Sequence, residues 1–85
     1  MKYTVVISRA AQKAMDRLDG DIYSRIIHKL ESLEDNPRPM GVEKLAGADN
    51  LYRIRVGDWR VIYMIQDKNL MVLVVKVAHR REVYR

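Results

Sequence analysis

The spacing of apolar residues changes about half-way along the chain. A β-branched run at Tyr3–Ile7 precedes two stripes with helical spacing. The first is formed by Ala10, Ala14 and Leu18, with Ala11 and Met15 beside them, and the second by Ile22, Ile26, Leu30 and Leu33. Such spacing places the apolar side chains on one face of each of two helices. Gly20 is expected just after the first helix, and the segment Asn36–Pro39 ends the second. The sequence therefore predicts a strand and a helical hairpin, with Ser8 as the first N-cap.

Three strands are predicted in the second half of the chain, after a loop-like stretch. Apolar and polar residues alternate in Leu51–Val56, Trp59–Gln66 is the second strand, and the third, Leu70–Ala78, is nearly all apolar. A strand of that kind is typically buried on both faces. The Gly57-Asp58 pair suits a two-residue type II′ hairpin turn. The order β-α-α-β-β-β indicates one α+β domain over residues 1–85, with the helical hairpin packed on one face of a small, mainly antiparallel sheet.

The net charge of +5 lies entirely in the last part of the chain. Residues 1–50 hold eight Lys or Arg and eight Asp or Glu, whereas residues 51–85 hold eight basic residues against three acids. Because this part is predicted to be sheet, including the tail His79–Arg85, the charge is expected on strands. It indicates a surface for a polyanion. The alternative is a set of solvated charges that only keep a small protein soluble.

Composition disfavours several kinds of site. The chain has no Cys, which excludes disulfides, a thiol nucleophile and cysteine-based zinc sites, and its two histidines are far apart in sequence. We therefore expect no metal site and no cofactor. Apolar runs are too short for a signal peptide or a membrane span, so a cytoplasmic protein without membrane contact is expected.

A cluster of guanidinium groups is predicted on one face of the sheet. Strand alternation places Arg53 and Arg55 together, about 7 Å apart, opposite the apolar side chains of their strand. The tight turn folds Arg60 back beside them. The last strand brings four further residues to one end of this sheet: His79, Arg80, Arg81 and Tyr84. Guanidinium groups pair bidentately with phosphate oxygens and keep their charge, so the cluster indicates phosphate as a ligand.

Two segments of the chain resemble the signature of the RelE/ParE superfamily of toxin–antitoxin toxins: Leu51–Tyr63 and Val74–Tyr84. The predicted order of elements and the chain length agree with this resemblance, which covers essentially the whole chain. It implies a RelE-type endoribonuclease that cleaves mRNA in the decoding site of the ribosome, without cofactor or metal. It also implies a RelB-like acidic antitoxin as the restraining partner. The complex of the two proteins is then expected to bind its own operator DNA through the antitoxin.

The resemblance also implies a catalytic set, which falls on Arg53, Arg55, Arg60, Arg80 and Tyr84. The best-known pattern has Lys at the first two of these positions. Arg orients phosphate but is a poor proton acceptor at neutral pH, so a general base on the first hairpin strand is not expected. Tyr84 and His79 are the alternatives for proton transfer. The residues expected to contact RNA are Lys44, His79, Arg81 and Arg85.

Two other functions are compatible with parts of the pattern. A ParE-type toxin has the same fold but poisons DNA gyrase and lacks the ribonuclease set. A non-catalytic RNA-binding module would use the same cationic face without chemistry. The presence of Arg60, Arg80 and Tyr84 favours the RelE-type ribonuclease over the ParE-type toxin.

Overall fold

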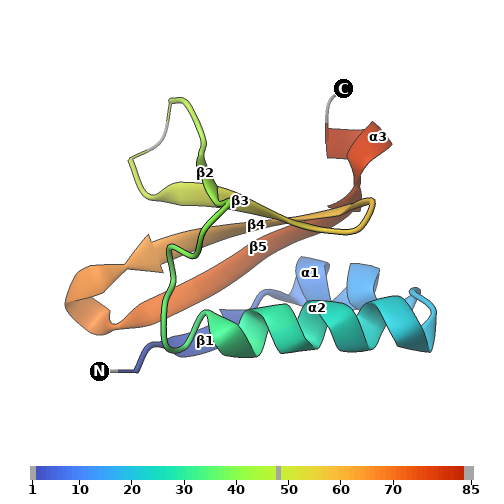
Figure 1. Cartoon of the computed structure of the whole chain (residues 1–85), viewed down its shortest axis with the longest axis horizontal. Helices are drawn as coiled ribbons and strands as arrows, with labels where there is room; N and C mark the ends of the chain where they lie inside the picture. Colours follow the sequence, from blue (N-terminus) through green and yellow to red (C-terminus); the bar gives the residue numbers. More distant parts are fainter. Residues whose placement is uncertain (1, 48, 84–85) are drawn as a thin grey trace.

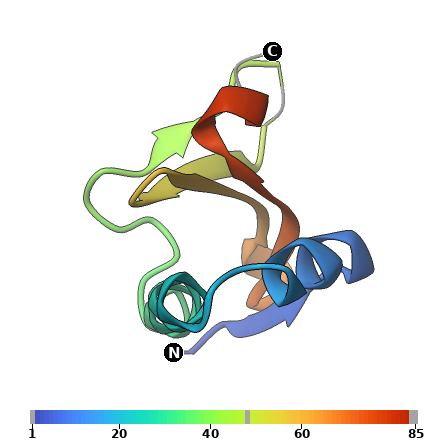
Figure 2. The same cartoon turned by 90° about the vertical axis from the view of Figure 1, so that its right-hand side faces the viewer.

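A five-stranded mixed sheet carries its two longer helices on one face (Figure 1). The computed structural model describes residues 2–47 and 49–83. In chain order the elements are β1 (Thr4–Ile7), α1 (Arg9–Asp16), α2 (Gly20–Ser32), β2 (Glu43–Lys44), β3 (Leu51–Val56), β4 (Trp59–Gln66), the 3₁₀ turn η1 (Asp67–Asn69), β5 (Met71–His79) and α3 (Arg80–Val83). The end-on view places α1 and α2 below the sheet, and α3 on its other side (Figure 2). The predicted α+β class and the position of the helical hairpin are confirmed.

The strand order β1-β5-β4-β3-β2 follows from one crossover, from β1 to β2, and three antiparallel hairpin connections. β1 runs parallel to β5, and all other neighbours are antiparallel. The β3–β4 hairpin has the predicted turn, because Gly57 takes a φ of 58° while Asp58 keeps a negative φ. That turn fixes the register in which Arg55 lies opposite Arg60. The position of Arg60 opposite Arg55 therefore depends on Gly57, which tolerates a left-handed backbone.

The core lies between the sheet and the helices. α1 is capped as predicted, since the hydroxyl of Ser8 accepts a hydrogen bond of 3.1 Å from the backbone N–H of Ala11. The helices bury Ala11, Met15, Ile26, Leu30 and Leu33, and the facing strand residues include Tyr63, Val61, Val72 and Val74. The predicted stripe of α2 is confirmed. The apolar face predicted for α1 is confirmed except at Ala10, which is exposed: Ala11 and Met15 are buried, and Ala14 and Leu18 pack partly buried against the core.

Three further predictions about local structure are wrong. Gly20 does not end α1 but begins α2 behind Asp19. The segment before β3 is not all loop, because two of its residues pair with β3 as β2. The tail beyond His79 forms the short helix α3 instead of continuing the strand. The last two concern very short elements, β2 and α3, for which local propensity is a weak guide.

β5 is buried on only one face, which corrects the expectation of burial on both. Val72 and Val74 are fully buried under the helices, whereas Met71 and Leu73 on the other face are half-buried. The reason is that α1 and α2 cover a single face, whereas the four-residue helix α3 is too short to cover the second (Figure 2). A nearly all-apolar strand therefore presents apolar side chains on the outer face of the sheet.

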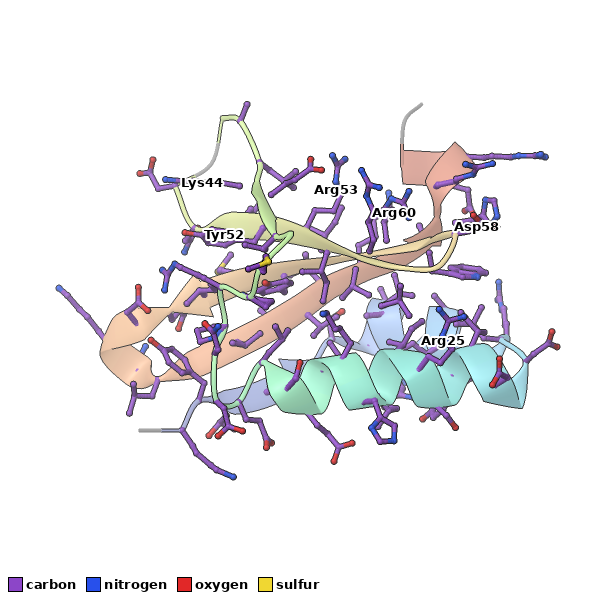
Figure 3. The ribbon with its side chains drawn as sticks, viewed as in Figure 1. Arg25, Lys44, Tyr52, Arg53, Asp58 and Arg60 are labelled. Carbon is purple, nitrogen blue, oxygen red and sulfur yellow. The ribbon has the colours of Figure 1, made fainter. Side chains whose placement is uncertain are left out.

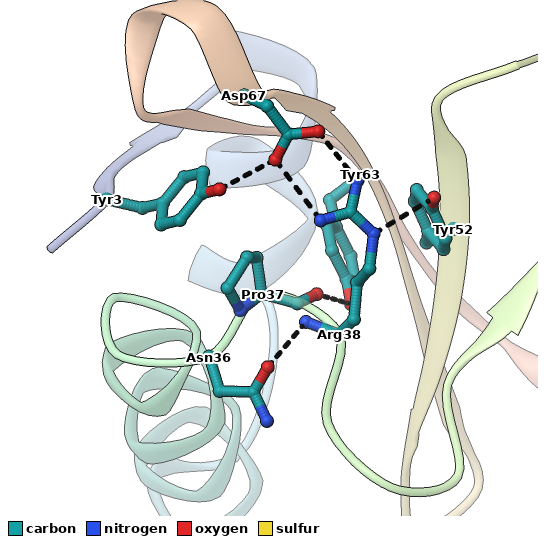
Figure 4. A network of polar contacts seen from close by, with 7 residues as sticks. All are labelled: Tyr3, Asn36, Pro37, Arg38, Tyr52, Tyr63 and Asp67. Carbon is teal, nitrogen blue, oxygen red and sulfur yellow. Dashed lines mark hydrogen bonds and ion pairs between the residues drawn. The ribbon is translucent and has the colours of Figure 1, made fainter. Parts of the chain in front are cut away.

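A polar network anchored on Arg38 joins the segment after α2 to the sheet (Figure 4). The guanidinium of Arg38 donates to both carboxylate oxygens of Asp67, at 3.1 and 2.8 Å, and to the hydroxyl of Tyr52 at 3.2 Å. The hydroxyl of Tyr3 donates to Asp67 at 2.6 Å. The hydrogen bonds from Arg38, followed by the one from Tyr3, lower the pKa of Asp67 to about 2. The network fixes the chain that leads into β2 and β3, and thus the strand that carries Arg53.

Candidate functional site

The face of the sheet opposite the helices gathers three arginines from one hairpin. Arg53 and Arg55 alternate with the buried residues of β3, and Arg55 is paired with Arg60 of β4. In Figure 3, Arg53 and Arg60 lie on the side of the sheet away from α2. We call Arg53, Arg55 and Arg60 the arginine face. The prediction that the tight turn brings Arg60 back beside the β3 arginines is confirmed.

Arg60 is the most constrained member of the arginine face. Only 6% of its surface is exposed, and its Nη1 donates to the carbonyl oxygens of Gly57 and Trp59, both at 3.0 Å. Its Nε is buried and has no hydrogen-bond partner within the described part of the chain. No carboxylate of those residues forms an ion pair with it. A buried cation with an unused donor is costly by itself and is stabilised by a bound anion.

Glu43 faces the arginines from the neighbouring strand β2. Its carboxylate lies 2.6 Å from Nη2 of Arg53 and 3.9 Å from Nη2 of Arg55. The hydrogen bond from Arg53 is the main reason why the pKa of Glu43 lies below its usual range. Sequence reasoning missed this residue because it placed the segment in a loop. The only sequence signal was an isolated acid shortly before the cationic hairpin.

The end of β5 and the start of α3 reach the turn of the same hairpin. His79 is paired with Trp59, and the two rings meet edge to face with centroids 5.5 Å apart. The backbone N–H of Arg81 donates to Nδ1 of His79 at 3.3 Å. The backbone N–H of Arg80 donates to the carbonyl oxygen of Asp58 at 2.8 Å, and its Nε lies 3.7 Å from the Asp58 carboxylate. The predicted approach of the tail to this end of the sheet is confirmed.

The remaining predicted residues are not brought to the arginine face. Lys44 is exposed on β2, but it is paired with Tyr52, and cross-strand partners share a face. It is therefore on the side opposite Glu43 and Arg53. Tyr84 and Arg85 lie outside the described residues, so their predicted roles rest on sequence alone. Trp59, predicted to pack in the core, is half-buried against it.

The described residues form neither a cluster of metal ligands nor a membrane-spanning helix. Across residues 2–47 and 49–83, no three His, Asp or Glu side chains are grouped so that they could hold a metal ion. No helix within those ranges is both long and apolar enough to span a membrane. The described site offers cationic hydrogen-bond donors. The turn holds the guanidinium of Arg60, and β3 carries those of Arg53 and Arg55. The imidazole of His79 and two further arginines lie at the end of β5.

A model of the family described as the ParE toxin of type II toxin–antitoxin system, parDE, matches residues 5–84. A putative RelE-like toxin protein of Escherichia coli is 33% identical, with 94% of this chain and 85% of that protein covered. The chain belongs to the RelE/ParE superfamily of type II toxins. Toxin RelE of Mycobacterium tuberculosis is a further superfamily member, 30% identical over 98% of this chain and 87% of that protein.

Solved structures of the superfamily share the whole architecture. The archaeal RelE–RelB complex from Pyrococcus horikoshii OT3 contains a chain that matches with a TM-score of 0.85 and 35% identity, covering 94% of this chain and 97% of that one. A mutant of E. coli toxin RelE in the free state matches with a TM-score of 0.82 and 26% identity, covering 99% of this chain and 92% of that one. The RelE/ParE resemblance seen in the sequence is therefore confirmed for the family and for the fold.

Proposed function

We propose that this type II toxin is a metal-independent endoribonuclease that cuts mRNA on the ribosome. The observation that carries the proposal is Arg60, a buried guanidinium with an unused Nε, held by two turn carbonyls on the arginine face. Its donors need no reorganisation when negative charge develops beside them, which is the arrangement that stabilises a transition state. Arg53 and Arg55 supply further donors for the two non-bridging oxygens of the scissile phosphate.

The reaction is an internal transfer on RNA. The 2′-OH loses its proton and its oxygen attacks the adjacent phosphorus, and the bond from phosphorus to the 5′-oxygen breaks. The products are a 2′,3′-cyclic phosphate and a 5′-OH, the latter formed when the leaving oxygen takes up a proton. Arg60 and Arg80 stabilise the pentavalent phosphorane, and the proton transfer is assigned to Tyr84 or His79. Lys44, Arg81 and Arg85 are proposed to contact the RNA outside the scissile phosphate.

The partner follows from the same relatives and from the charge. The Pyrococcus horikoshii structure is a RelE–RelB complex, and this chain, with a net charge of +5, is proposed to bind a RelB-like acidic antitoxin. An amphipathic helix of that partner would bury the half-exposed apolar side chains of the toxin. The complex is proposed to bind its operator DNA through the antitoxin. Co-purification with a net-basic partner that leaves the arginine face open would contradict this assignment.

A second candidate function is favoured by the description of the matching family model, which is that of a ParE toxin. A ParE-type toxin acts on DNA gyrase and not on RNA. The arginine face argues against it, because a buried cation with an unused donor serves phosphate chemistry and has no purpose in a purely steric contact. The two candidates predict different damage in the cell.

The test expresses the full chain and its Arg60→Met variant in separate cultures. A ribonuclease gives mRNA ends within codons, mapped by primer extension, for the wild type and not for the variant. A gyrase poison gives DNA breaks with an SOS response and intact mRNA. Messages left intact by the wild type would exclude the ribonuclease. Cleavage in purified translation reactions without added metal, and with a chelator present, tests metal independence.

A further inference from the structure

A second set of basic side chains lines a groove away from the arginine face, between α2 and the β3–β4 turn. The groove has a volume of about 640 Å³, and its α2 wall is formed by Ser24, Arg25, His28, Lys29 and Ser32. The other wall includes Arg55 and Gly57. We call this the α2 groove. Figure 3 shows Arg25 directed from α2 toward the sheet and its turn.

Of the basic side chains in the α2 groove, Arg25 and Lys29 form no ion pair with the described residues, whereas Arg55 lies 3.9 Å from the Glu43 carboxylate. Arg25 and Lys29 are four residues apart on one face of α2, where two like charges destabilise a helix. Asp21, one turn before Arg25, forms no ion pair with it. Throughout the described ranges, no carboxylate lies within 4.0 Å of either basic side chain. Within the described residues, no carboxylate offsets the repulsion between Arg25 and Lys29, so an anion from outside the chain is needed to offset it.

The groove is held in place by the turn that also holds Arg60. A Cβ added to Gly57 would lie 3.5 Å from both Nη atoms of Arg25, so this guanidinium packs against the turn. Glycine is required there because its φ is 58°. Arg55 belongs to both the groove and the arginine face, and 67% of its side chain is exposed. One continuous cationic track thus passes from the sheet to α2 by way of Arg55.

We propose that the α2 groove binds the phosphate backbone of RNA, as a second contact area beside the scissile site. The proposal rests on the proposed function, in which RNA is the polyanion held by the arginine face. Continuity through Arg55 favours RNA over an acidic protein segment, because a phosphate chain carries evenly spaced charges along such a track. The serine hydroxyls beside Arg25 and Lys29 add donors for phosphate oxygens. The RNA is either the message or ribosomal RNA.

The test compares two double variants with the same net charge. Arg25→Gln with Lys29→Gln removes both cations of the groove while keeping two good helix formers. Lys13→Gln with Lys68→Gln removes two exposed cations from α1 and from η1, away from the groove. Thermal unfolding shows that both fold, and the groove variant should not be less stable than wild type because the like-charge pair is gone.

Binding is measured in two arms, with a single-stranded RNA oligonucleotide and with message-free ribosomes, each over a series of salt concentrations. If message binds in the groove, the oligonucleotide arm weakens and its log–log salt slope falls by about 1.4 for two lost phosphate contacts, using 0.7 per contact. If ribosomal RNA binds there, the ribosome arm weakens instead. Either result, with the control double variant close to wild type, supports the proposal.

Other outcomes separate RNA binding in the α2 groove from the proposed ribonuclease function, because each can fail while the other holds. If the groove variant matches the control in both arms, the groove does not bind RNA, although Arg60→Met can still abolish cleavage. If the groove variant loses only its affinity for the antitoxin, the groove is a protein-binding surface and the proposal is wrong. If the wild type cleaves no mRNA but the groove variant loses RNA binding, the proposed function fails and the groove stands.

Discussion

The carboxylate of Glu43 forms an ion pair with Arg53, at 2.6 Å from its Nη2. The contact joins β2 to β3 in register, and the same carboxylate lies 3.9 Å from Nη2 of Arg55. Because the hydrogen bond from Arg53 lowers the pKa of Glu43, the carboxylate stays ionised at neutral pH. If the arginine face binds RNA as proposed, the RNA must displace this internal anion to reach both arginines of β3.

Replacing Glu43 by Gln should strengthen RNA binding by about two- to fivefold, the range expected for a partly exposed ion pair. Gln keeps the size and an acceptor for Arg53 but removes the competing charge. The matched control is Asp35→Asn, which removes one charge from an exposed carboxylate that lies 4.0 Å from Lys2. Affinity for an RNA oligonucleotide is measured by anisotropy. Equal gains in both variants would mean that only net charge matters and that Glu43 does not compete for the arginines.

Arg60→Met should separate catalysis from stability. The cleavage rate should fall on the order of 10²-fold or more, because a prepositioned donor to the transition state is lost. Thermal stability should change little, because removing a buried charge with an unpartnered Nε offsets the loss of the two bonds to the carbonyls of Gly57 and Trp59. Arg9→Met, at an exposed position of α1, serves as the control. A variant that cleaves at the wild-type rate would remove Arg60 from the mechanism, and one that unfolds would assign it a structural role.

The roles of Tyr84 and His79 are separated by two conservative changes. Tyr84→Phe keeps the ring and deletes the hydroxyl, so cleavage should fall nearly as far as in Tyr84→Ala if Tyr84 transfers the proton. His79→Gln should cleave at close to the wild-type rate, because the ring contact with Trp59 and the bond from the Arg81 N–H describe a packing role. Single-turnover cleavage rates decide between them. If Tyr84→Phe is active and His79→Gln is not, the imidazole transfers the proton.

Much of this site was predictable because a two-residue turn fixes the pairing of its strands. Gly57-Asp58 sets Arg55 opposite Arg60, and alternation sets Arg53 on the same face. The contact between Glu43 and Arg53 was not predictable, since β2 has two residues and no periodicity. The burial of Arg60 was missed for a related reason. It depends on two turn carbonyls that point at the guanidinium, a feature of backbone geometry that residue types do not reveal.

Tyr63→Phe should destabilise the fold although it removes a single oxygen atom. The Tyr63 hydroxyl donates to the carbonyl oxygen of Pro37 at 2.7 Å in the core, and burial raises the pKa of this phenol, so it stays protonated. Deleting it leaves a buried carbonyl unpaired, at a cost of about 1–3 kcal/mol. Tyr23→Phe is the control, because its hydroxyl only accepts a 3.4 Å bond from Gln12. Denaturant unfolding measures both. If Tyr63→Phe and Tyr23→Phe lower the free energy of unfolding equally, the hydrogen bond to Pro37 does not stabilise the fold.

Asp67 gives the fold a defined dependence on pH. Its pKa in the folded protein is about 2, chiefly because Arg38 donates to it, against about 3.9 in an unfolded chain. A carboxyl with a lowered pKa contributes stability above its unfolded pKa and loses that stability as the pH falls through its folded value. The Arg38 network should therefore stabilise the fold fully at pH 7 and weaken between about pH 4 and pH 2.

Asp67→Asn tests this by removing the charge while keeping the shape of the side chain. Its melting temperature should lie below that of the wild type at pH 7, and the difference should shrink below about pH 4 and vanish near pH 2. Arg38→Gln should show the same profile, because it removes the partner of the same carboxylate. Asp35→Asn, whose carboxylate lies 4.0 Å from Lys2, should show almost no difference at any pH. A constant difference between wild type and Asp67→Asn from pH 7 to pH 2 would mean that the charge of Asp67 does not hold the network together.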